Sequence, residues 1–516
     1  MRLDTLWIGS FKNLQDFSID FDEQSLTTVL VGGNGTGKSN LLEALVLVFR
    51  DLDLGAPPAF PYQLSYLCRE RRIRIDADPT RQGETIKVAV NDVALPYRRF
   101  VQEPERLYLP NYVFGYYSGP SNRLESHFEK HQERFYQALL RGDDQALRPL
   151  FYARLVHSQF VLLSFFSEHD PEATQFLSDY LGIEGLESVL FVMTQPPWQS
   201  KEGDSRFWRA RGVVQRFLDK LYSVALAPIR LSQRVSFGLR QAKTLEHLYL
   251  YVSDVDGLRE LASLYGNQPE FFKTLESTYI SELIKEVRIR VKVRQVGGIL
   301  TFRELSEGEQ QLLTVLGLLR FTKEEESLFL LDEPDTHLNP TWSIKYLDLL
   351  KQVVGEQTTS HVIMATHDPL VIAGLEKSQV QIMQRDEGTR RISAETPEQD
   401  PKGMGVAAIL TSELFGLRSS LDLETLDKLD QKRELASKES LTSEEKAKLD
   451  ALNAELGNLD FTRSVRDPLY KPFVEAMVAA DEYQQLKKPV LTPEEQQKQR
   501  ELAVRIVEEL RRKQAG

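Results

Sequence analysis

The sequence contains little of what secreted or membrane proteins need. Cys68 is the only cysteine among 516 residues, so neither an intrachain disulfide nor a cysteine-based zinc site can form. No apolar run approaches the roughly eighteen residues of a membrane span, and the first residues lack the pattern of a secretory signal. We therefore expect a cytoplasmic protein without membrane association, in which Cys68 is a buried apolar thiol.

The chain also lacks an excess of positive charge. Its 64 lysine and arginine residues are outnumbered by 76 aspartate and glutamate residues, which gives a formal net charge of −12. An acidic protein is repelled by a phosphate backbone at long range, so contact with nucleic acid would require a local basic surface. The composition therefore disfavours a simple DNA-binding protein.

The hydrophobic pattern divides the chain into four segments. Residues 1–120 and 285–399 alternate strands with helices, as expected for two parts of one α/β domain. Residues 121–284 lack sustained heptads, so we expect a mostly helical insertion and not a long coiled coil. Residues 400–516 are polar with an amphipathic leucine stripe, which predicts a helical C-terminal region.

A glycine-rich loop follows the first strongly apolar strand. It matches the pattern G-x-x-x-x-G-K-S/T and stands between a strand and a helix, which is the context that a phosphate-binding P-loop requires. Glycines let consecutive backbone N–H groups face phosphates, and the helix N-terminus favours the same anions. The residues expected to contact a nucleotide are Gly32, Gly33, Asn34, Gly35, Thr36, Gly37, Lys38, Ser39 and Asn40.

Two later strands end in polar residues. Four apolar residues precede Asp332 and Glu333, so these carboxylates emerge at the carboxyl end of a buried strand, where α/β sheets bind ligands. A second strand, beginning at His361, ends at His367. Each pattern alone is also typical of a strand that ends in solvated polar residues.

A serine and a glycine begin another predicted helix. Ser306 and Gly308 stand in the sequence LSEGEQQ, directly before an apolar helical run. A small polar turn at a helix start is suited to bind a phosphate. The same sequence would equally form an ordinary helix N-cap followed by an acid, and taken alone it favours that interpretation.

Taken together and in order, the four motifs resemble the ATP-binding-cassette (ABC) head of SMC, RecF and OLD-family ATPases. The resemblance covers roughly residues 1–120 and 285–395 and implies an α/β P-loop ATPase that binds ATP and Mg²⁺. It implies that Lys38 contacts the phosphates and that Ser39 and Asp332 hold Mg²⁺. Glu333 would polarise the attacking water, and His367 would hydrogen-bond the γ-phosphate and this acid.

The same resemblance implies a site shared between two copies of the chain. Ser306, Gly308 and Glu309 of a second copy would then cap the γ-phosphate, so we expect a homodimer or higher homo-oligomer. The chain departs from the family pattern at two places: its signature loop reads LSEGE, and the Q-loop glutamine has no clear counterpart. We place the Q-loop role at Tyr117–Gly119, where a predicted strand ends.

Phe11–Leu14 resembles a turn near the start of SMC- and OLD-type heads. Val113–Pro120 and Ala408–Leu417 are similar to ATPases of the PtuA family, which act in Septu and certain retron antiphage systems. In that family the ATPase pairs with a separate HNH nuclease of the PtuB kind, which implies such a partner here. A RecF/SMC-like repair ATPase acting directly on DNA is the alternative, whereas a transporter ATPase is disfavoured because its cassette is much shorter.

The sequence shows neither an HNH-like histidine cluster nor the carboxylates of a TOPRIM nuclease, so we predict no intrinsic nuclease site. Residues 400–516 are either a docking surface for the partner or a solvated helical tail. One strand alternates apolar with basic residues, and its basic face either contacts nucleic acid or is simply solvated, the second being favoured. That face consists of Arg288, Arg290, Lys292 and Arg294.

Overall fold

The computed structural model describes all residues except 23–24, 26, 104, 144–147, 238–240, 295–297, 323–325, 355–358, 387, 418, 437–439, 459–475, 477–479, 481–492 and 516. The chain divides into two compact units, Met1–Arg418 and Ser419–Gly516, which we describe separately. In the described part of the chain, no helix combines the length and apolar composition that crossing a membrane requires.

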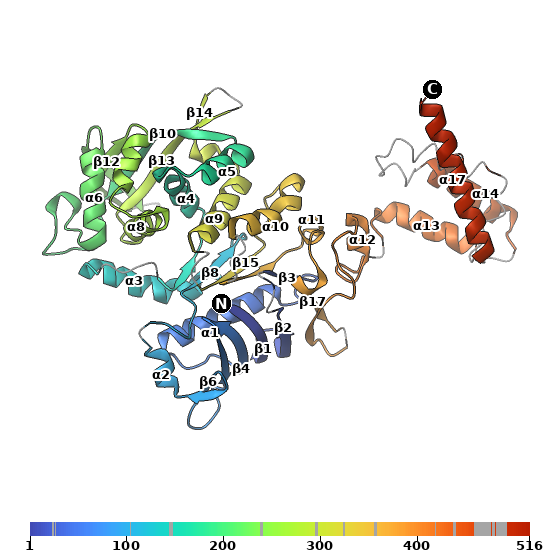
Figure 1. Ribbon diagram of the computed structural model, residues 1–516, viewed down its shortest axis with the longest axis horizontal. Helices are drawn as coiled ribbons and strands as arrows, with labels where there is room; N and C mark the ends of the chain where they lie inside the picture. Colours follow the sequence, from blue (N-terminus) through green and yellow to red (C-terminus); the bar gives the residue numbers. More distant parts are fainter. Residues whose placement is uncertain are drawn as a thin grey trace. The chain divides into compact units, whose positions relative to one another are not determined.

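A seven-stranded sheet lies at the centre of the first unit, in the order β18-β17-β3-β16-β15-β8-β9 (Figure 1). All neighbouring pairs are parallel except β17 and β18. The inner strands are buried on both faces, as the continuous apolar runs predict. The strands are β3 (Thr27–Val31), β8 (Tyr112–Tyr117), β9 (Leu150–Tyr152), β15 (Ser327–Asp332), β16 (Ser360–Ala365), β17 (Val380–Arg385) and β18 (Ile392–Glu395).

Two hydrophobic cores cover the two faces of this sheet. Alternate residues of β15 enter different cores: Leu330 faces the core with helix α1 (Lys38–Leu54), while Leu331 faces the core with α9 (Glu307–Thr322) and α10 (Pro340–Val354). The P-loop connects β3 to α1 and thus lies at the carboxyl edge of the parallel strands, where α/β folds bind ligands.

A six-stranded antiparallel sheet packs against the other side of α1, in the order β2-β1-β4-β5-β6-β7. Cys68 ends one of its strands and is fully buried, and burial raises the pKa of its thiol to about 11, so it is the inert apolar thiol expected. The elements are β1 (Arg2–Phe11), β2 (Leu14–Asp20), β4 (Tyr62–Cys68), β5 (Arg71–Ala77), β6 (Ile86–Val90), β7 (Val93–Leu95) and α2 (Tyr97–Val101).

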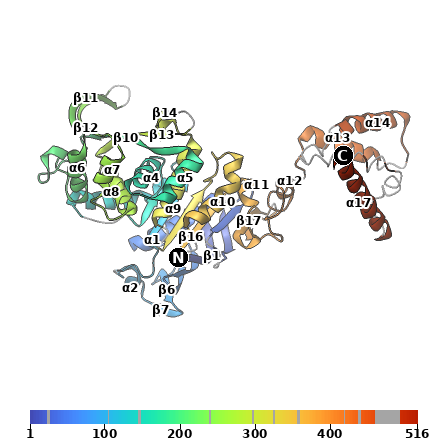
Figure 2. The ribbon, with the colours of Figure 1, turned by 45° about the horizontal axis from the view of Figure 1, so that its top comes forward.

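The inserted segment contains more helix than strand, as expected, but it also contributes strands to a five-stranded antiparallel sheet that the sequence did not reveal, and this sheet extends past residue 284 to include β13 and β14. Its order is β11-β12-β10-β13-β14, and Figure 2 shows it beside helices α4, α5, α7 and α8. The helices are η1 (Glu125–Phe128), α3 (Glu129–Arg141), α4 (Val156–Ser167), α5 (Pro171–Leu181), η2 (Ser205–Phe207), α6 (Gly212–Val224), α7 (Val255–Ala262), α8 (Gln268–Ile280) and η3 (Phe302–Glu304). The strands are β10 (Ile183–Thr194), β11 (Ile229–Phe237), β12 (Gln241–Val252), β13 (Ile284–Val293) and β14 (Gly298–Thr301).

Strand β13 is the strand predicted from alternating apolar and basic residues. Its apolar side chains are buried and its basic ones exposed. Arg288 pairs with Glu286 at 2.9 Å, Lys292 with Glu187 at 3.3 Å, and Arg294, just beyond the strand, with Glu184 at 3.2 Å. This pairing favours the solvated interpretation of the basic face, since acidic neighbours offset its charge.

His361 on β16 is fully buried and links three strands. Its Nδ1 accepts a hydrogen bond from the backbone N–H of Leu3 (3.1 Å), so Nε2 carries the proton and donates to Oγ1 of Thr28 (3.0 Å). Burial lowers the pKa of His361 to about 3, from an ordinary value of 6.5. The imidazole is therefore a neutral structural group at neutral pH.

We expect this histidine to make the fold sensitive to acid. Between pH 6.5 and about 3 the unfolded chain binds a proton at His361 and the folded chain does not. As the pH is lowered through this window, the free energy of unfolding should therefore decrease. This residue contributes up to about 1.4 kcal/mol per pH unit to the decrease. Unfolding of His361→Gln should show a shallower pH dependence than the wild type or the exposed control His169→Gln. If the free energy of unfolding depended on pH equally steeply in His361→Gln and in the wild type, His361 would not be the source of the acid sensitivity.

The first unit closes with α11 (Pro369–Ile372), η4 (Lys377–Gln379) and α12 (Val406–Thr411) and continues to residue 418. The second unit contains α13 (Leu423–Ala436), α14 (Ser443–Asn458) and α17 (Pro493–Ala515). A capping box begins α14, because Thr442 and Glu445 exchange hydrogen bonds. Leu452 and Leu456 of the leucine stripe expected in this region are buried, whereas Leu459 lies outside the described residues.

Candidate active site

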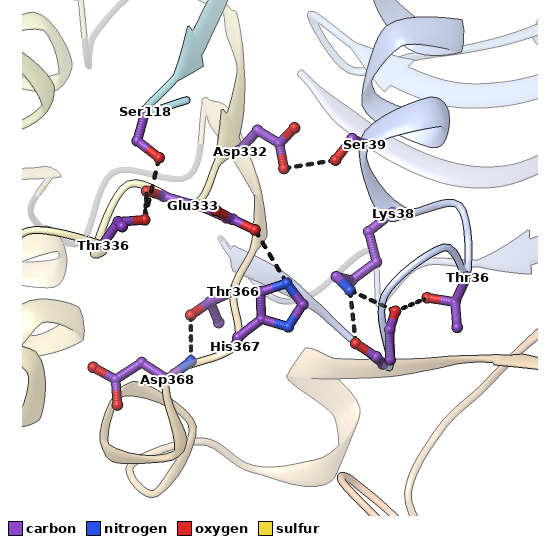
Figure 3. Close-up of polar contacts among 12 residues, drawn as sticks. Thr36, Lys38, Ser39, Ser118, Asp332, Glu333, Thr336, Thr366, His367 and Asp368 are labelled. Atoms are coloured by element: carbon purple, nitrogen blue, oxygen red, sulfur yellow. Dashed lines mark hydrogen bonds and ion pairs between the residues drawn. The ribbon is translucent and has the colours of Figure 1, made fainter. Parts of the chain in front are cut away.

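The P-loop has the backbone shape that its glycines allow. Gly32, Gly35 and Gly37 have positive φ angles of 148°, 80° and 94°. A Cβ on Gly32 would lie 2.2 Å from the carbonyl oxygen of Met383, so a larger residue there would displace the loop. In Figure 3 the Lys38 ammonium points back into the loop and donates to the carbonyl oxygens of Gly32 (2.6 Å) and Gly33 (3.1 Å).

Asn13 supports this loop from the turn between β1 and β2. Its side-chain amide donates to the carbonyl oxygen of Gly35 (2.9 Å), and its oxygen accepts from the side chain of Asn40 (2.6 Å). We did not identify Asn13 as a site residue from the sequence. Asn13 lies within Phe11–Leu14, a stretch whose sequence resembles related ATPases. That resemblance did not assign a role to Asn13.

Asp332 meets the P-loop helix at the carboxyl end of β15. The Ser39 hydroxyl donates to its Oδ1 at 3.1 Å (Figure 3), and Nη2 of Arg123 lies 3.4 Å from its Oδ2. Burial raises the pKa of Asp332, although Ser39 and Arg123 act in the opposite direction. A hydroxyl and a buried carboxylate side by side are hard oxygen ligands of the kind that Mg²⁺ prefers, so these residues fit the ion.

Glu333 and His367 form the second pair of the site. Nε2 of His367 lies 3.1 Å from Oε1 of Glu333, as Figure 3 shows. Burial lowers the pKa of His367 and the charge of Lys38 lowers it further, against the effect of Glu333. The imidazole is therefore neutral near pH 7 and can donate one hydrogen bond to the carboxylate. This interaction holds Glu333 in a fixed orientation.

Many of the predicted residues line one cavity of about 170 Å³, whereas Gly32, Gly33, Thr36 and Asp332 are not among its lining residues. Its size and its lining by backbone amides and charged side chains suit the phosphates of a nucleotide. Its lining residues are Asn13, Asn34, Gly35, Gly37, Lys38, Ser39, Asn40, Arg123, Glu333 and His367. Arg123 belongs to this set and carried no motif, so the sequence did not indicate it.

Ser118 occupies the position at which we placed the Q-loop role. It follows β8, and its backbone N–H donates to the carbonyl oxygen of Asp332 (3.2 Å). Its hydroxyl lies 3.1 Å from Oγ1 of Thr336 (Figure 3). The end of β8 is thus joined directly to Asp332 and to the loop that follows Glu333.

The signature loop lies outside this cavity. Ser306 is exposed and caps α9, where its hydroxyl donates to Glu309 (2.8 Å) and accepts from the backbone N–H of the same residue (3.3 Å). A Cβ on Gly308 would lie 2.4 Å from the carbonyl oxygen of His337, so this glycine packs against the loop after β15. Within one chain Lys38 therefore lies near Asp332 and Glu333. Ser306, Gly308 and Glu309 are not part of this group.

Comparisons with known proteins agree with this geometry. A family model described as an AAA domain of the AbiEii toxin kind in a type IV TA system matches residues 201–373, and one described as an AAA ATPase domain matches residues 1–92.

The Septu protein PtuA of Bacillus mycoides (strain KBAB4) is 28% identical over 166 residues, which is 30% of this chain and 23% of that protein. The DNA replication and repair protein RecF of Nostoc punctiforme is 32% identical over 108 residues, 19% of this chain and 24% of that protein. The matched segments span about a quarter of these relatives.

Two solved structures align with 77% of this chain. One is an SMC head bound to the C-terminal winged-helix domain of ScpA (13% identity, TM-score 0.35, 98% of that chain), and the other is the SMC head domain from Thermotoga maritima (15% identity, TM-score 0.32, 100% of that chain). The fold class predicted from the motifs is confirmed by the parallel sheet with its P-loop and by the two family models. The chain thus contains an α/β P-loop domain that two AAA-type family models match in part, and part of its sequence is similar to the Septu protein PtuA.

Proposed function

We propose that the chain binds and hydrolyses ATP between two copies of itself. The observation that carries this proposal is the separation of Ser306 from the cavity that holds Lys38. Ser306 is exposed at a helix N-terminus, where a phosphate on another molecule can reach it. Two copies facing each other would add this loop to each phosphate cavity, so ATP would join them and hydrolysis would release them.

Each side chain around the cavity would have a different role in ATP hydrolysis. Lys38 would leave its loop carbonyls for the phosphates, while Ser39 and Asp332 would hold Mg²⁺. The ion, when bound, supplies positive charge that offsets the phosphate oxygens. Glu333 would accept a hydrogen bond from the attacking water, and neutral His367 would hold that carboxylate in place. Acceleration would come from position and charge and would need no covalent intermediate.

A matched pair of variants tests the contribution from the second copy. Ser306→Asp and Ser306→Asn both retain a side chain that caps α9, but only aspartate brings negative charge toward the partner's ATP. We expect Ser306→Asp to lose at least about tenfold in ATPase rate, because like charges that face each other across an interface are repulsive. Ser306→Asn should retain more activity. Equal rates for the two variants would contradict the proposal.

Mixing two inactive variants then shows whether the site is shared. A Ser306→Asp chain paired with a Lys38→Ala chain has one intact cavity, formed by Lys38 of the first and Ser306 of the second. Random pairing should restore roughly a quarter of the wild-type rate, since about half of the symmetric dimers become mixed and each has one intact site. A site contained in one chain would regain no activity on mixing.

We propose further that the ATPase belongs to an antiphage defence complex and regulates a separate HNH-type nuclease. The similarity to the Septu protein PtuA supports this role, and the helical second unit offers a surface for a partner. A RecF-like ATPase that acts directly on DNA is the second candidate, which the 32% identity to RecF over 108 residues favours. Co-purification of the full chain with a nuclease encoded beside it, with and without ATP, separates the two. ATP-dependent DNA binding by the chain alone, without a nuclease partner, would favour the second.

A further inference from the structure

Arg123 is a second cation in the phosphate cavity besides Lys38. Its guanidinium lies 3.4 Å from Asp332, and its Cζ is 5.4 Å from the centre of the Tyr117 ring. The side chain is 38% exposed, so it can move without disturbing the core. No motif of the family assigns it a role.

The backbone around Arg123 is firmly held, which leaves its side chain as the mobile part. The carbonyl oxygen of Arg123 accepts a hydrogen bond from Ser126 (3.1 Å), and the next residue, Leu124, is buried. Further along the same segment, Glu125 accepts from Arg154 (2.7 Å), and His127 contacts Glu43 of α1 (2.8 Å). The guanidinium therefore starts from a fixed point at the edge of the cavity.

The pairing of Arg123 with Asp332 is a weak one. A distance of 3.4 Å to one oxygen lacks the two parallel hydrogen bonds of a strong arginine–carboxylate pair. Asp332 is also a residue that would hold Mg²⁺, and a carboxylate engaged by a metal ion has less charge to offer a guanidinium. Arg123 would then need another anion, and the planar guanidinium matches phosphate oxygens well.

We propose that Arg123 pairs with Asp332 in the nucleotide-free chain and moves to the phosphates when a nucleotide binds. Arg123 is then a phosphate-binding residue of the ATP site. Before the nucleotide binds, it offsets the negative charge of Asp332. This inference depends on the proposed function, because it requires ATP in this cavity. It goes beyond that function by adding a residue from outside the family motifs.

Equilibrium binding of a fluorescent ATP analogue to the full chain tests the assignment without relying on turnover. In saturating Mg²⁺, where the ion occupies Asp332 and the guanidinium is released, Arg123→Gln should bind a non-hydrolysable form of the analogue at least about tenfold more weakly than wild type, because charge-assisted contacts to phosphate are lost. Arg123→Lys keeps the positive charge but loses the planar set of N–H donors, so its affinity for the analogue should be intermediate. In a Mg²⁺ titration, Arg123→Gln should need less Mg²⁺ for half-maximal binding, since the cation competing for Asp332 is gone.

Arg141→Gln is the matched control, because Arg141 is exposed at the end of α3, pairs with Asp143 and does not line the cavity. Its affinity should equal that of wild type. Unchanged affinity of Arg123→Gln in saturating Mg²⁺ would overturn the inference and reduce Arg123 to a partner of Asp332. Should Arg123→Gln fail to fold, Arg123→Lys with wild-type affinity would overturn it equally. A wild-type chain that binds no nucleotide would instead refute the proposed function itself.

Discussion

Replacing Glu333 by glutamine is expected to slow ATP hydrolysis by at least about a hundredfold while leaving ATP binding intact. Glutamine retains the size of the side chain and can still contact His367, but it cannot accept a proton from the attacking water. Lys38, Ser39 and Asp332, which would hold the nucleotide, remain unchanged in this variant. The loss should therefore fall on kcat and not on the affinity for ATP.

The trapped nucleotide should also change the assembly state. If ATP joins two chains and hydrolysis releases them, Glu333→Gln should accumulate as a dimer or larger homo-oligomer in ATP but not in ADP. Mass measurement in solution and single-turnover hydrolysis assays follow the two effects together. Glu260→Gln, which changes an exposed glutamate of α7 paired with Lys220, should behave as wild type. Normal turnover by Glu333→Gln would exclude Glu333 as the water-polarising residue.

A second large effect is expected at a buried ion pair in the insertion. Glu276 of α8 is fully buried between Arg148 (2.7 Å) and His157 (2.8 Å). Burial alone would raise its pKa, but His157 and Arg148 outweigh that effect and hold the pKa at about 2. Glu276→Gln would leave the buried Arg148 charge uncompensated, so we expect about 3–5 kcal/mol of lost stability.

This loss should appear as a melting temperature lower by about 3–6 °C, measured by differential scanning calorimetry, since the entropy of unfolding grows with the size of the unit. Because the cost comes from the unpaired charge, Arg148→Met combined with Glu276→Gln should recover part of it. A single variant that melts like wild type would show that the pair contributes little. A double variant no more stable than the single one would show that packing, and not charge, accounts for the loss.

The proposed site residues that could be predicted from the sequence are those whose chemistry is local. A P-loop is a contiguous strand, turn and helix, so the spacing of its glycines and of Lys38 already specifies the geometry that contacts phosphates. Asp332 and Glu333 stand at the end of a continuous apolar strand, and His367 lies two residues beyond the end of another. Such runs place polar residues at one edge of a parallel sheet before the strand order is known.

The residues that the sequence missed depend on contacts between distant segments. Arg123 and Asp332 are 209 positions apart and meet because β8 pairs with β15. The insertion forms a sheet because β10 pairs with β13 about a hundred residues later, and the apolar runs of β10 fit a buried helix as well as a strand. Local patterns carry no information about such pairings.

The sequence by itself determined that this chain carries a P-loop ATPase site, because each part of that chemistry lies within a few consecutive residues. Only the tertiary structure decided that Arg123 and Asn13 join this site and that Ser306 stays outside it. The reason is that strand pairing and helix packing set the distances between remote segments, and those distances depend on the whole core and not on any single stretch of chain.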